Sequence, residues 1–334
     1  MIIPAEPVDT SGEAVVTVIV PGRDVAAFAD EALTSLQAQT MPRWRAVLVD
    51  DGSLDATGEI FARAAASDAR IALIRHDRPQ GLGAARNAGL ALVQTPFVGF
   101  LDADDVLAPT ALERLTGTLA ATGSDFAVGA YVRLRPDEAN GYTPGGIQPW
   151  VTASTSPERR GTTIDEHPAA SGNVVAWSKV SRIEFWRRLG LRFPEGRLYE
   201  DQVVAQRMYA HARAFDVIPD VVVQWRERAD GSSITQRTDA VAVLHDYLEA
   251  MSAGLAELES TGHRAAARER VNLILTMDLP PLVRIARDHA EPEYRRTLGA
   301  FVRALSHRAT RDTQSAPAAL DETSAALVSA AILW

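Results

Sequence analysis

The first hundred residues alternate between continuous apolar runs and segments in which apolar residues recur every three or four positions. The apolar runs are short, rich in β-branched residues and closed by proline, glycine or acidic residues, as buried parallel strands are. The intervening segments have the spacing of amphipathic helices. This alternation predicts an α/β fold with a right-handed, mostly parallel sheet and helices on both faces. We expect strands at 14–20, 46–49, 71–74 and 95–101, with helices at 25–39, 56–66 and 84–93.

Strands and helices no longer alternate regularly in the next part of the chain. We expect strands at 126–134 and 217–225, a short helix at 182–189 and a further helix at 202–212. Residues 135–163 are polar and rich in Gly, Pro, Ser and Thr, which predicts a mobile loop over the site.

A third pattern begins near residue 240, where Ala, Leu, Arg and Glu dominate with helical periodicity. It continues to about residue 305, and we expect Pro280-Pro281 to interrupt the helix there. The last residues read as a loose linker with a short apolar helix. The chain thus divides into an α/β domain, a helical unit and a terminal segment, at 1–237, 238–305 and 306–334.

Composition narrows the class of protein. The chain has 334 residues, of which 46% are hydrophobic and 23% charged, as in ordinary globular proteins. Its net charge of −9 argues against nucleic acid as the main partner, and the absence of cysteine excludes disulfides and zinc–thiolate sites. Residues 1–12 do not resemble a signal peptide, and no apolar run reaches the roughly twenty residues of a spanning helix. We expect a cytoplasmic protein, or one associated with the inner face of the membrane.

Two of the predicted strands end in clustered carboxylates. The strand at 46–49 runs into Asp50-Asp51, and the strand at 95–101 runs into Asp102-Ala103-Asp104-Asp105. In open α/β sheets ligands bind beyond the carboxyl ends of the strands, and hard divalent cations prefer carboxylate oxygen. Asp102 and Asp104 are therefore candidates for holding Mg²⁺ or Mn²⁺ against a substrate diphosphate. The alternative is structural, because acids also stabilise the N-terminus of a following helix.

The later part of the chain adds an acidic pair and a basic loop. Glu200-Asp201 opens the helix expected at 202–212, where it has two interpretations: a helix cap, or a general base facing a site. Arg226, Arg228 and the hydroxyl residues that follow them suit phosphate oxygens, although such a run is also typical of a solvated surface. The seven histidines show no metal-ligand spacing.

Taken in order, four motifs resemble those of glycosyltransferase family 2. They are Val-Thr-Val-Ile-Val-Pro at 16–21, Val-Leu-Val-Asp-Asp-Gly-Ser-Leu-Asp at 47–55, Gly-Leu-Gly-Ala-Ala-Arg-Asn-Ala-Gly at 81–89 and Phe-Leu-Asp-Ala-Asp-Asp at 100–105. Trp177-Ser178-Lys179, Glu200-Asp201 and the loop from Arg226 to Thr235 are similar to the acceptor-side motifs of that family. The resemblance covers about 14–237 and is nearest to bacterial enzymes of teichoic-acid-like wall polymers and exopolysaccharide.

The resemblance implies a GT-A, Rossmann-like fold with a donor half at about 14–120 and an acceptor half at about 121–237. It also implies a nucleotide-diphosphate sugar donor, Mn²⁺ or Mg²⁺, and inversion at the anomeric carbon. Asp201 would be the general base, oriented by Glu200, and Asp104 would bind the metal with Asp102, which also lies near the ribose. The other implied contacts are Pro21, Arg23, Asp51, Arg86, Ala103, Arg228 and Ser233 with the donor, and Trp177 and Lys179 with the acceptor.

Two departures from the family pattern leave the nucleotide open. Pro21-Gly22-Arg23-Asp24 stands where the family usually has Pro-Val-Tyr-Asn, and Arg78-Pro79-Gln80 replaces an asparagine before the glycine turn. Uridine is the default base. The alternatives for Arg23 are a contact with a different base, a contact with a phosphate, or no contact.

The residues are compatible with more than one class of function. We expect a hexosyl- or N-acetylhexosaminyl-transferase whose acceptor is a glycan or a polyol-phosphate polymer. One alternative is a nucleotidyltransferase on a related sheet, and another is a catalytically silent scaffold or binding protein. The C-terminal helices are candidates for forming a homo-oligomer.

Overall fold

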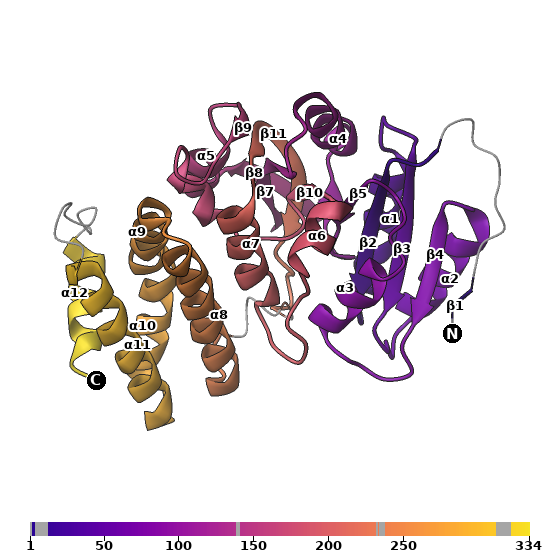
Figure 1. Ribbon diagram of the computed structural model, residues 1–334. Helices are drawn as coiled ribbons and strands as arrows, with labels where there is room; N and C mark the ends of the chain where they lie inside the picture. Colours follow the sequence, from indigo (N-terminus) through magenta and orange to yellow (C-terminus); the bar gives the residue numbers. More distant parts are fainter. Residues whose placement is uncertain (1, 4–12, 138–140, 232, 234–237, 312–321) are drawn as a thin grey trace.

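A single large sheet runs through the α/β domain of the computed structural model, which describes residues 2–3, 13–137, 141–231, 233, 238–311 and 322–334. Figure 1 shows the C-terminal helices gathered beside this domain. The expected α/β class is therefore confirmed. The strand order is β1 (Ile2–Ile3), β4 (Ile71–Arg75), β3 (Trp44–Asp50), β2 (Val16–Gly22), β5 (Phe97–Phe100), β10 (Lys179–Arg182), β7 (Phe126–Asp137), β11 (Phe215–Arg226) and β6 (Val106–Leu107).

The four strands β4, β3, β2 and β5 are parallel, as the alternating pattern predicts. Their carboxyl ends therefore meet at one edge of the sheet. The pairing continues into the acidic segments, since Asp51 donates its N–H to Gly22 at 3.0 Å and Ala103 donates to Pro21 at 3.3 Å. Both acidic segments thus flank the end of β2.

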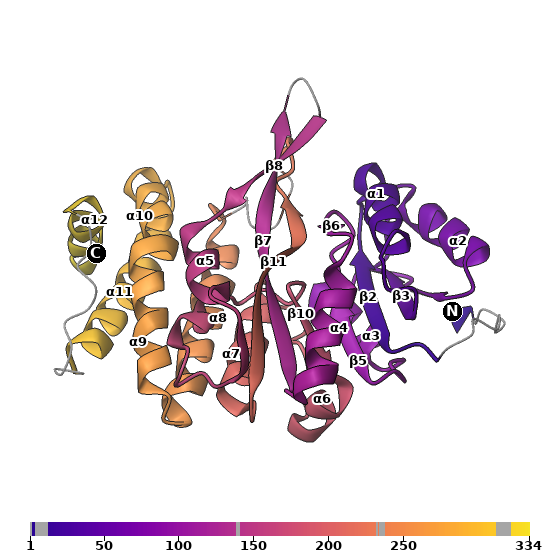
Figure 2. The same ribbon diagram turned by 90° about the horizontal axis from the view of Figure 1, so that it is seen from above.

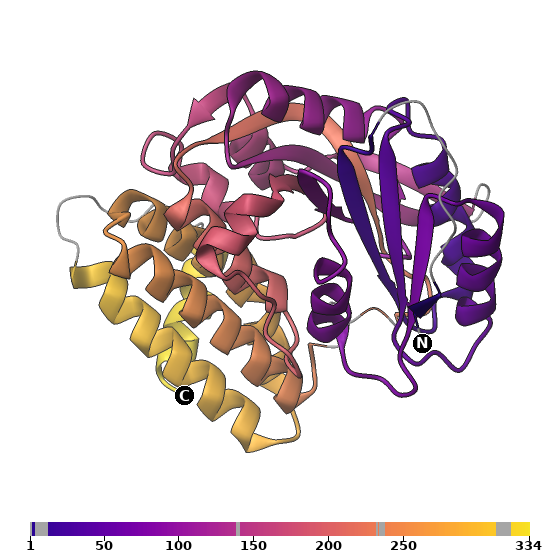
Figure 3. The same ribbon diagram turned by 45° about the vertical axis from the view of Figure 1, so that its right-hand side comes forward.

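The helices of the donor half cover both faces of these strands, with α3 (Leu82–Leu90) opposite α1 (Ala26–Gln37) and α2 (Thr57–Ser67) (Figure 3). Glycine allows two close approaches. A Cβ on Gly22 would lie 2.8 Å from Phe61 of α2, and one on Gly89 of α3 would lie 2.5 Å from Ile19. The strand-end edge is consequently held between tightly packed helices.

The acceptor half makes the whole sheet mixed rather than mostly parallel. β10 is antiparallel to both β5 and β7, whereas β7 and β11 are parallel. The expected strands and helices of this half are confirmed, the helices being α6 (Ile183–Leu189) and α7 (Glu200–His211). The helix α4 (Ala111–Thr122) packs on β7 and β11, and the rings of Phe126 and Phe215 stack at 5.1 Å.

The prediction of a long loop at 135–163 is wrong. β7 continues to Asp137 and pairs with β8 (Gly141–Ile147), which is followed by α5 (Pro149–Thr155) and β9 (Arg159–Thr162). The β8 sequence carries glycine and proline, so its strand conformation comes from backbone pairing with β7 rather than from an apolar pattern. Figure 2 shows this hairpin projecting from the sheet. Residues 138–140 lie outside the described part of the chain.

The C-terminal unit has its own apolar core, built from residues of every helix in it. Its helices are α8 (Val241–Ser260), α9 (Arg264–Leu273), α10 (Leu279–Asp288), α11 (Pro292–Arg311) and α12 (Glu322–Ile332), with a π-helical turn at Ile274–Asp278. None of the described helices is both long and apolar enough to cross a membrane.

Two predictions for this unit are corrected. Pro280-Pro281 does not end the helical run, because both prolines fall in the first turn of α10, directly after the π-helical turn, where the hydrogen-bonding pattern changes. The helical run from α9 through the π turn to α10 is continuous. In addition, α11 extends past residue 305 to Arg311. The short apolar helix expected near the end is α12.

Candidate active site

Asp51, at the carboxyl end of β3, holds the turn that leads into α3. Its carboxylate accepts backbone hydrogen bonds from Gln80 at 2.9 Å and from Gly81 at 2.8 Å, and His76 Nδ1 lies 2.7 Å from Oδ1. Gly81 has a φ of 95°, which glycine adopts at little cost. Asp51 therefore fixes one of the strand-end turns, and its contact with a nucleobase stays a prediction.

The unusual loop after β2 is tied to the neighbouring strand-end loop. Asp24, in the left-handed region at φ 51°, accepts a hydrogen bond from Leu54 N at 2.8 Å and donates its N–H to Ser53 Oγ at 3.1 Å. Arg23 pairs with Asp24 at 3.4 Å and keeps half of its side chain exposed. The loop thus has a defined conformation in which Arg23 stays accessible to a ligand.

Arg86, on α3, is a buried cation shared by two carboxylates. Its guanidinium donates to Asp102 Oδ1 at 2.7 Å and to Glu200 Oε1, and only 1% of the residue is exposed. Burial lowers the pKa of Arg86, but the negative charges of Asp102 and Glu200 outweigh burial and raise the pKa overall. Arg86 therefore remains charged and joins the end of β5 to the start of α7.

Glu200 and Asp201 lie in the first turn of α7, where Glu200 is buried and Asp201 is partly buried. Burial raises the pKa of Glu200 to about 7, although Arg86 acts in the opposite direction. Burial also raises the pKa of Asp201, again opposed by Arg86, and the negative charge of Asp102 adds to the rise. A carboxylate with a raised pKa accepts a proton more readily near neutral pH.

Two arginines near the end of β11 reach back to the acidic segment after β5. Arg228 Nε and Nη2 lie 2.8 and 2.7 Å from Asp104 Oδ2. Arg226 donates its backbone N–H to Asp105 Oδ1 at 2.8 Å and its Nε to the carbonyl of Asp104 at 2.7 Å. Burial raises the pKa of Asp104 and, more strongly, that of Asp105. The structure therefore brings the acidic strand end and the basic loop together.

Asp102 and Asp104 form a donor set that fits a hard divalent cation. Their side chains keep 24% and 17% of their surface exposed, and the buried Oδ2 of Asp105 beside them has no hydrogen-bond partner in the described structure. No described group of three or more His, Asp or Glu side chains is arranged to hold a metal. A cation would therefore take its remaining ligands from substrate and water, as Mg²⁺ commonly does.

The two residues expected to contact the acceptor are buried. The ring of Trp177 meets Tyr131 edge-on at 4.8 Å and stacks on Trp225 at 6.4 Å. Lys179 Nζ donates to the backbone carbonyls of Asn173 at 2.8 Å and Val175 at 2.7 Å. These are contacts of the protein interior, and the acceptor roles of Trp177 and Lys179 stay predictions.

Burial also pushes the pKa of Lys179 down to about 7, and the negative charge of Asp201 opposes this shift. A cavity of about 10 Å³, lined by Lys179, Asp201 and mainly apolar side chains, lies between them. That volume is sufficient for one water at most. The base candidate thus has a buried amine and a small cavity beside it.

Three further predicted donor contacts differ in exposure. Pro21 and Ala103 are buried at the end of β2 and after β5, whereas Ser233 is half-buried. Its neighbours at 232 and 234–237 lie outside the described residues. The donor contacts of all three stay predictions.

The comparisons with known proteins agree with these motifs. The family model "Glycosyl transferase family 2" matches residues 17–182, which include every strand-end acid described above. The α/β domain of this chain, over residues 17–182, belongs to glycosyltransferase family 2. One similar protein is the uncharacterized glycosyltransferase EpsJ of Bacillus subtilis. It is 27% identical over 269 residues, covering 80% of this chain and 76% of EpsJ.

A second relative of this family 2 chain is the succinoglycan biosynthesis protein ExoU of Rhizobium meliloti. It is 26% identical over 274 residues, covering 79% of this chain and 78% of ExoU. Among solved structures, S. aureus TarS 1-349 in complex with UDP-GlcNAc superposes with a TM-score of 0.69 at 19% identity, covering 88% of this chain and 82% of TarS 1-349. At that identity the likeness shows the fold, and it supports the GT-A architecture expected for family 2.

Sequence reasoning missed two residues that shape this family 2 site. Tyr142, from the segment expected to be a loop, lies 4.3 Å from the guanidinium of Arg226, and Glu31 of α1 binds Arg226 Nη2 at 2.6 Å. Neither residue belongs to a motif, and both are distant from Arg226 in sequence. The one sequence feature that could have pointed to Tyr142 is the expectation that residues 135–163 lie over the site. Tyr142 belongs to that segment, and its contact with Arg226 places it there.

Proposed function

We propose that this protein is an inverting glycosyltransferase that moves a sugar from a nucleotide-diphosphate donor to a hydroxyl group of a bacterial cell-wall or surface polysaccharide. Asp201 is the general base, Glu200 orients it, and Asp104 with Asp102 binds a divalent cation. The single observation that carries the proposal is the bridge made by Arg86. It connects Asp102 at a donor-side strand end with Glu200, the residue next to Asp201.

The base assignment rests on environment and position. Asp201 is partly buried near the carboxylate of Asp102, and both burial and that charge raise its pKa, which favours proton uptake from an acceptor hydroxyl. Glu200 is anchored by Arg86, so the first turn of α7 is fixed relative to the donor side. Inversion requires the base to act on the face of the sugar opposite the leaving diphosphate. A base on α7 and a leaving-group site after β5 provide such a separation.

The donor side must stabilise the charge of the departing diphosphate. A bound Mg²⁺ or Mn²⁺ on Asp102 and Asp104 would neutralise that charge as a Lewis acid. Arg228 supplies a second positive charge at the same place, since its Nη2 lies 2.7 Å from Asp104 Oδ2. Arginine is suited to phosphate because its guanidinium donates several hydrogen bonds in a fixed plane.

The comparisons support a donor class and an acceptor class for this proposal. TarS binds UDP-GlcNAc, which supports a UDP-sugar, either hexosyl or N-acetylhexosaminyl, as the donor here. The naming of ExoU for succinoglycan biosynthesis supports a surface polysaccharide as the acceptor class. Such a polymer would be extended at the inner face of the membrane, where we place the protein.

The test is a donor screen with the full chain. UDP-, GDP- and dTDP-sugars are added with Mn²⁺, and both thermal shift and release of nucleoside diphosphate in the presence of polysaccharide acceptors are measured. The proposal predicts a shift and turnover with a UDP-sugar. Release of pyrophosphate from a nucleoside triphosphate would instead indicate a nucleotidyltransferase, and binding of no nucleotide would indicate a scaffold.

A further inference from the structure

The segment 197–202, which carries Glu200 and Asp201, is held from outside by the C-terminal unit. Asp246 of α8 accepts a hydrogen bond from Leu198 N at 3.0 Å and pairs with Arg197 at 2.9 Å. At the other end of the segment, Arg270 of α9 donates to Gln202 Oε1 at 3.3 Å. Two helices of the C-terminal unit therefore contact the segment on both sides of the proposed base, α8 before it and α9 after it.

Tyr199, between these two anchors, has an unusual backbone conformation. Its φ of 57° and ψ of 31° place it in the left-handed region, which bulky residues rarely occupy because of the clash of their Cβ. Among the described residues Asp24 is the other non-glycine residue with positive φ. Such conformations persist only where surrounding contacts enforce them, and they are often found at functional sites. An enforcing contact is therefore expected at Tyr199.

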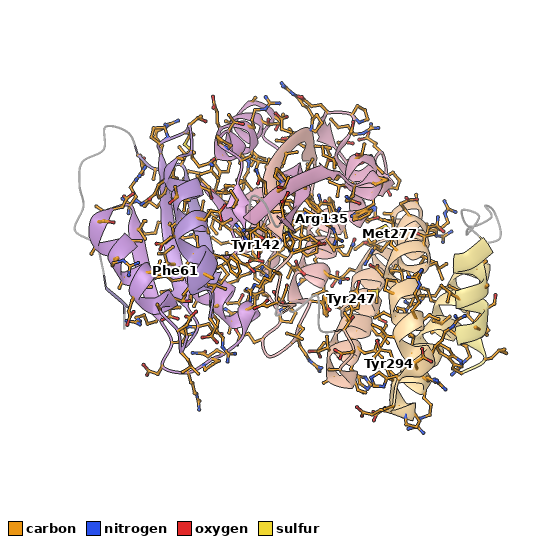
Figure 4. All side chains as sticks on the ribbon, turned by 180° about the vertical axis from the view of Figure 1, so that it is seen from behind. Phe61, Arg135, Tyr142, Tyr247, Met277 and Tyr294 are labelled. Carbon is orange, nitrogen blue, oxygen red and sulfur yellow. The ribbon has the colours of Figure 1, made fainter. Side chains whose placement is uncertain are left out.

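Tyr247 of α8 makes that contact. The two tyrosine rings stack, with their centroids 4.2 Å apart and an angle of 24° between their planes. The hydroxyl of Tyr199 is buried and has no hydrogen-bond partner in the described structure. The ring, rather than the hydroxyl, thus fixes Tyr199. Figure 4 shows Tyr247 on the side of the C-terminal unit that faces the α/β domain.

Tyr247 is itself fixed by a polar pair within the C-terminal unit. Its Oη donates to Asp278 Oδ1 at 2.9 Å, and Arg270 lies 3.0 Å from Asp278 Oδ2. Asp278 is the last residue of the π-helical turn. Such turns are rare in proteins overall, and those that occur are frequently found at functional sites. The chain of contacts thus runs from Asp278 through Tyr247 to Tyr199 and then to Glu200 and Asp201.

We propose that Tyr247, fixed by Asp278, is a positioning residue that holds Tyr199 in the left-handed conformation and thereby sets the place of the base Asp201. The inference rests on the proposed function, because it assigns the C-terminal unit a part in that reaction. Tyr247 touches no reacting group. It acts through the backbone of the 197–202 segment, and its loss misplaces Asp201 without removing any donor contact.

The test compares Tyr247→Ala, Tyr247→Phe and Asp278→Asn with Leu305→Ala. Leu305 is buried in the core of the same unit on α11, so its truncation destabilises the unit without touching the clamp. Tyr247→Ala should lower kcat roughly 10- to 100-fold, as small misplacements of reacting groups do, with the KM for donor within about twofold of wild type. Tyr247→Phe keeps the ring stack and should lose less, and Leu305→Ala should keep the wild-type kcat.

A second measurement does not depend on activity. Backbone hydrogen exchange in 198–202 should be faster in Tyr247→Ala than in wild type and unchanged in Leu305→Ala. Equal kcat in Tyr247→Ala and Leu305→Ala, or exchange in 198–202 that does not respond to Tyr247→Ala, overturns the positioning role. A wild-type protein that transfers no sugar contradicts the proposed function instead, and the exchange result then decides on the clamp alone.

Discussion

Arg86 and Glu200 are 114 positions apart in the chain, yet they form an ion pair in which both side chains are buried. Asp102 shares the same guanidinium. The Arg86 cation thus links two carboxylates that come from different parts of the fold. The pair therefore determines how the donor half meets the helix that carries Asp201.

The first prediction concerns the loss of this cation. Arg86→Ala leaves Glu200 and Asp102 without their partner, and removal of one member of a buried pair typically costs about 3–5 kcal/mol of unfolding free energy. Urea unfolding measures the loss. The control is Arg160→Ala, because Arg160 is exposed and pairs only at the surface with Glu158, where a pair contributes about 1 kcal/mol or less. Equal losses in the two variants would contradict the role of Arg86.

The second prediction is a pH dependence due to Glu200. Burial raises the pKa of Glu200 to about 7, from 4.5 for a free side chain, so the folded state disfavours its ionised form. The stability linked to its protonated form is fully present below the unfolded pKa and is lost as the pH rises through about 7. Glu200→Gln removes this dependence.

The unfolding free energy of Glu200→Gln minus that of wild type should therefore increase between pH 5 and pH 8, by something on the order of 1–3 kcal/mol. Denaturant titrations at four pH values measure the difference, in which titrating groups distant from Glu200 cancel between the two proteins. A difference that stays constant or decreases with pH would show that Glu200 ionises normally in the folded protein.

The third prediction uses two helical glycines. A Cβ on Gly83 of α3 would lie 2.1 Å from the carbonyl oxygen of Pro194, whereas one on Gly117 of α4 would meet nothing within 4 Å. Gly83→Ala should force α3 away from the segment before Glu200 and cost about 1–3 kcal/mol. Gly117→Ala should stabilise by about 0.5–1 kcal/mol, since alanine favours helix. Thermal melts of both variants measure these changes in stability. An unchanged Tm for Gly83→Ala would argue against the close approach of α3 to the Pro194 carbonyl.

The fourth prediction concerns competition for Asp104. Arg228 occupies the Asp104 oxygen that a cation would use, so Arg228→Met should bind Mn²⁺ roughly tenfold more tightly, equal to about 1.4 kcal/mol, when no donor is present. Calorimetry measures this affinity. Arg135→Met is the matched control, because Arg135 is half exposed and pairs with Glu227 instead. Asp104→Ala should abolish binding, and chelation of the metal should abolish transfer. Binding that is equal in wild type and Arg228→Met would exclude competition.

The donor half could be predicted from the sequence because its strands are buried on both faces and read as continuous apolar runs. The acids after them could be placed as well, since parallel strands end at one edge. By contrast, β8 could not be predicted, because its three glycines and one proline form a strand only by pairing with β7. Local patterns describe a strand that carries its own apolar signal, and β8 carries none.

The connections within the site were also beyond the sequence. Nothing near Arg86 indicates that Glu200 is its partner, and nothing near Tyr199 indicates a left-handed residue held by Tyr247. Lys179 belongs to a motif that suggested an acceptor contact, while the structure buries its amine against carbonyl groups. Each of these features depends on contacts between segments that are far apart in the chain.

The most direct test of the central claim is a comparison of Asp201→Asn with wild type in donor binding and in sugar transfer. Asparagine keeps the size of aspartate but cannot accept the proton. We predict that Asp201→Asn binds the nucleotide-sugar with an affinity within about twofold of wild type and transfers at least about 100-fold more slowly, as loss of a general base does. Transfer at the wild-type rate by Asp201→Asn would contradict the assignment of the base.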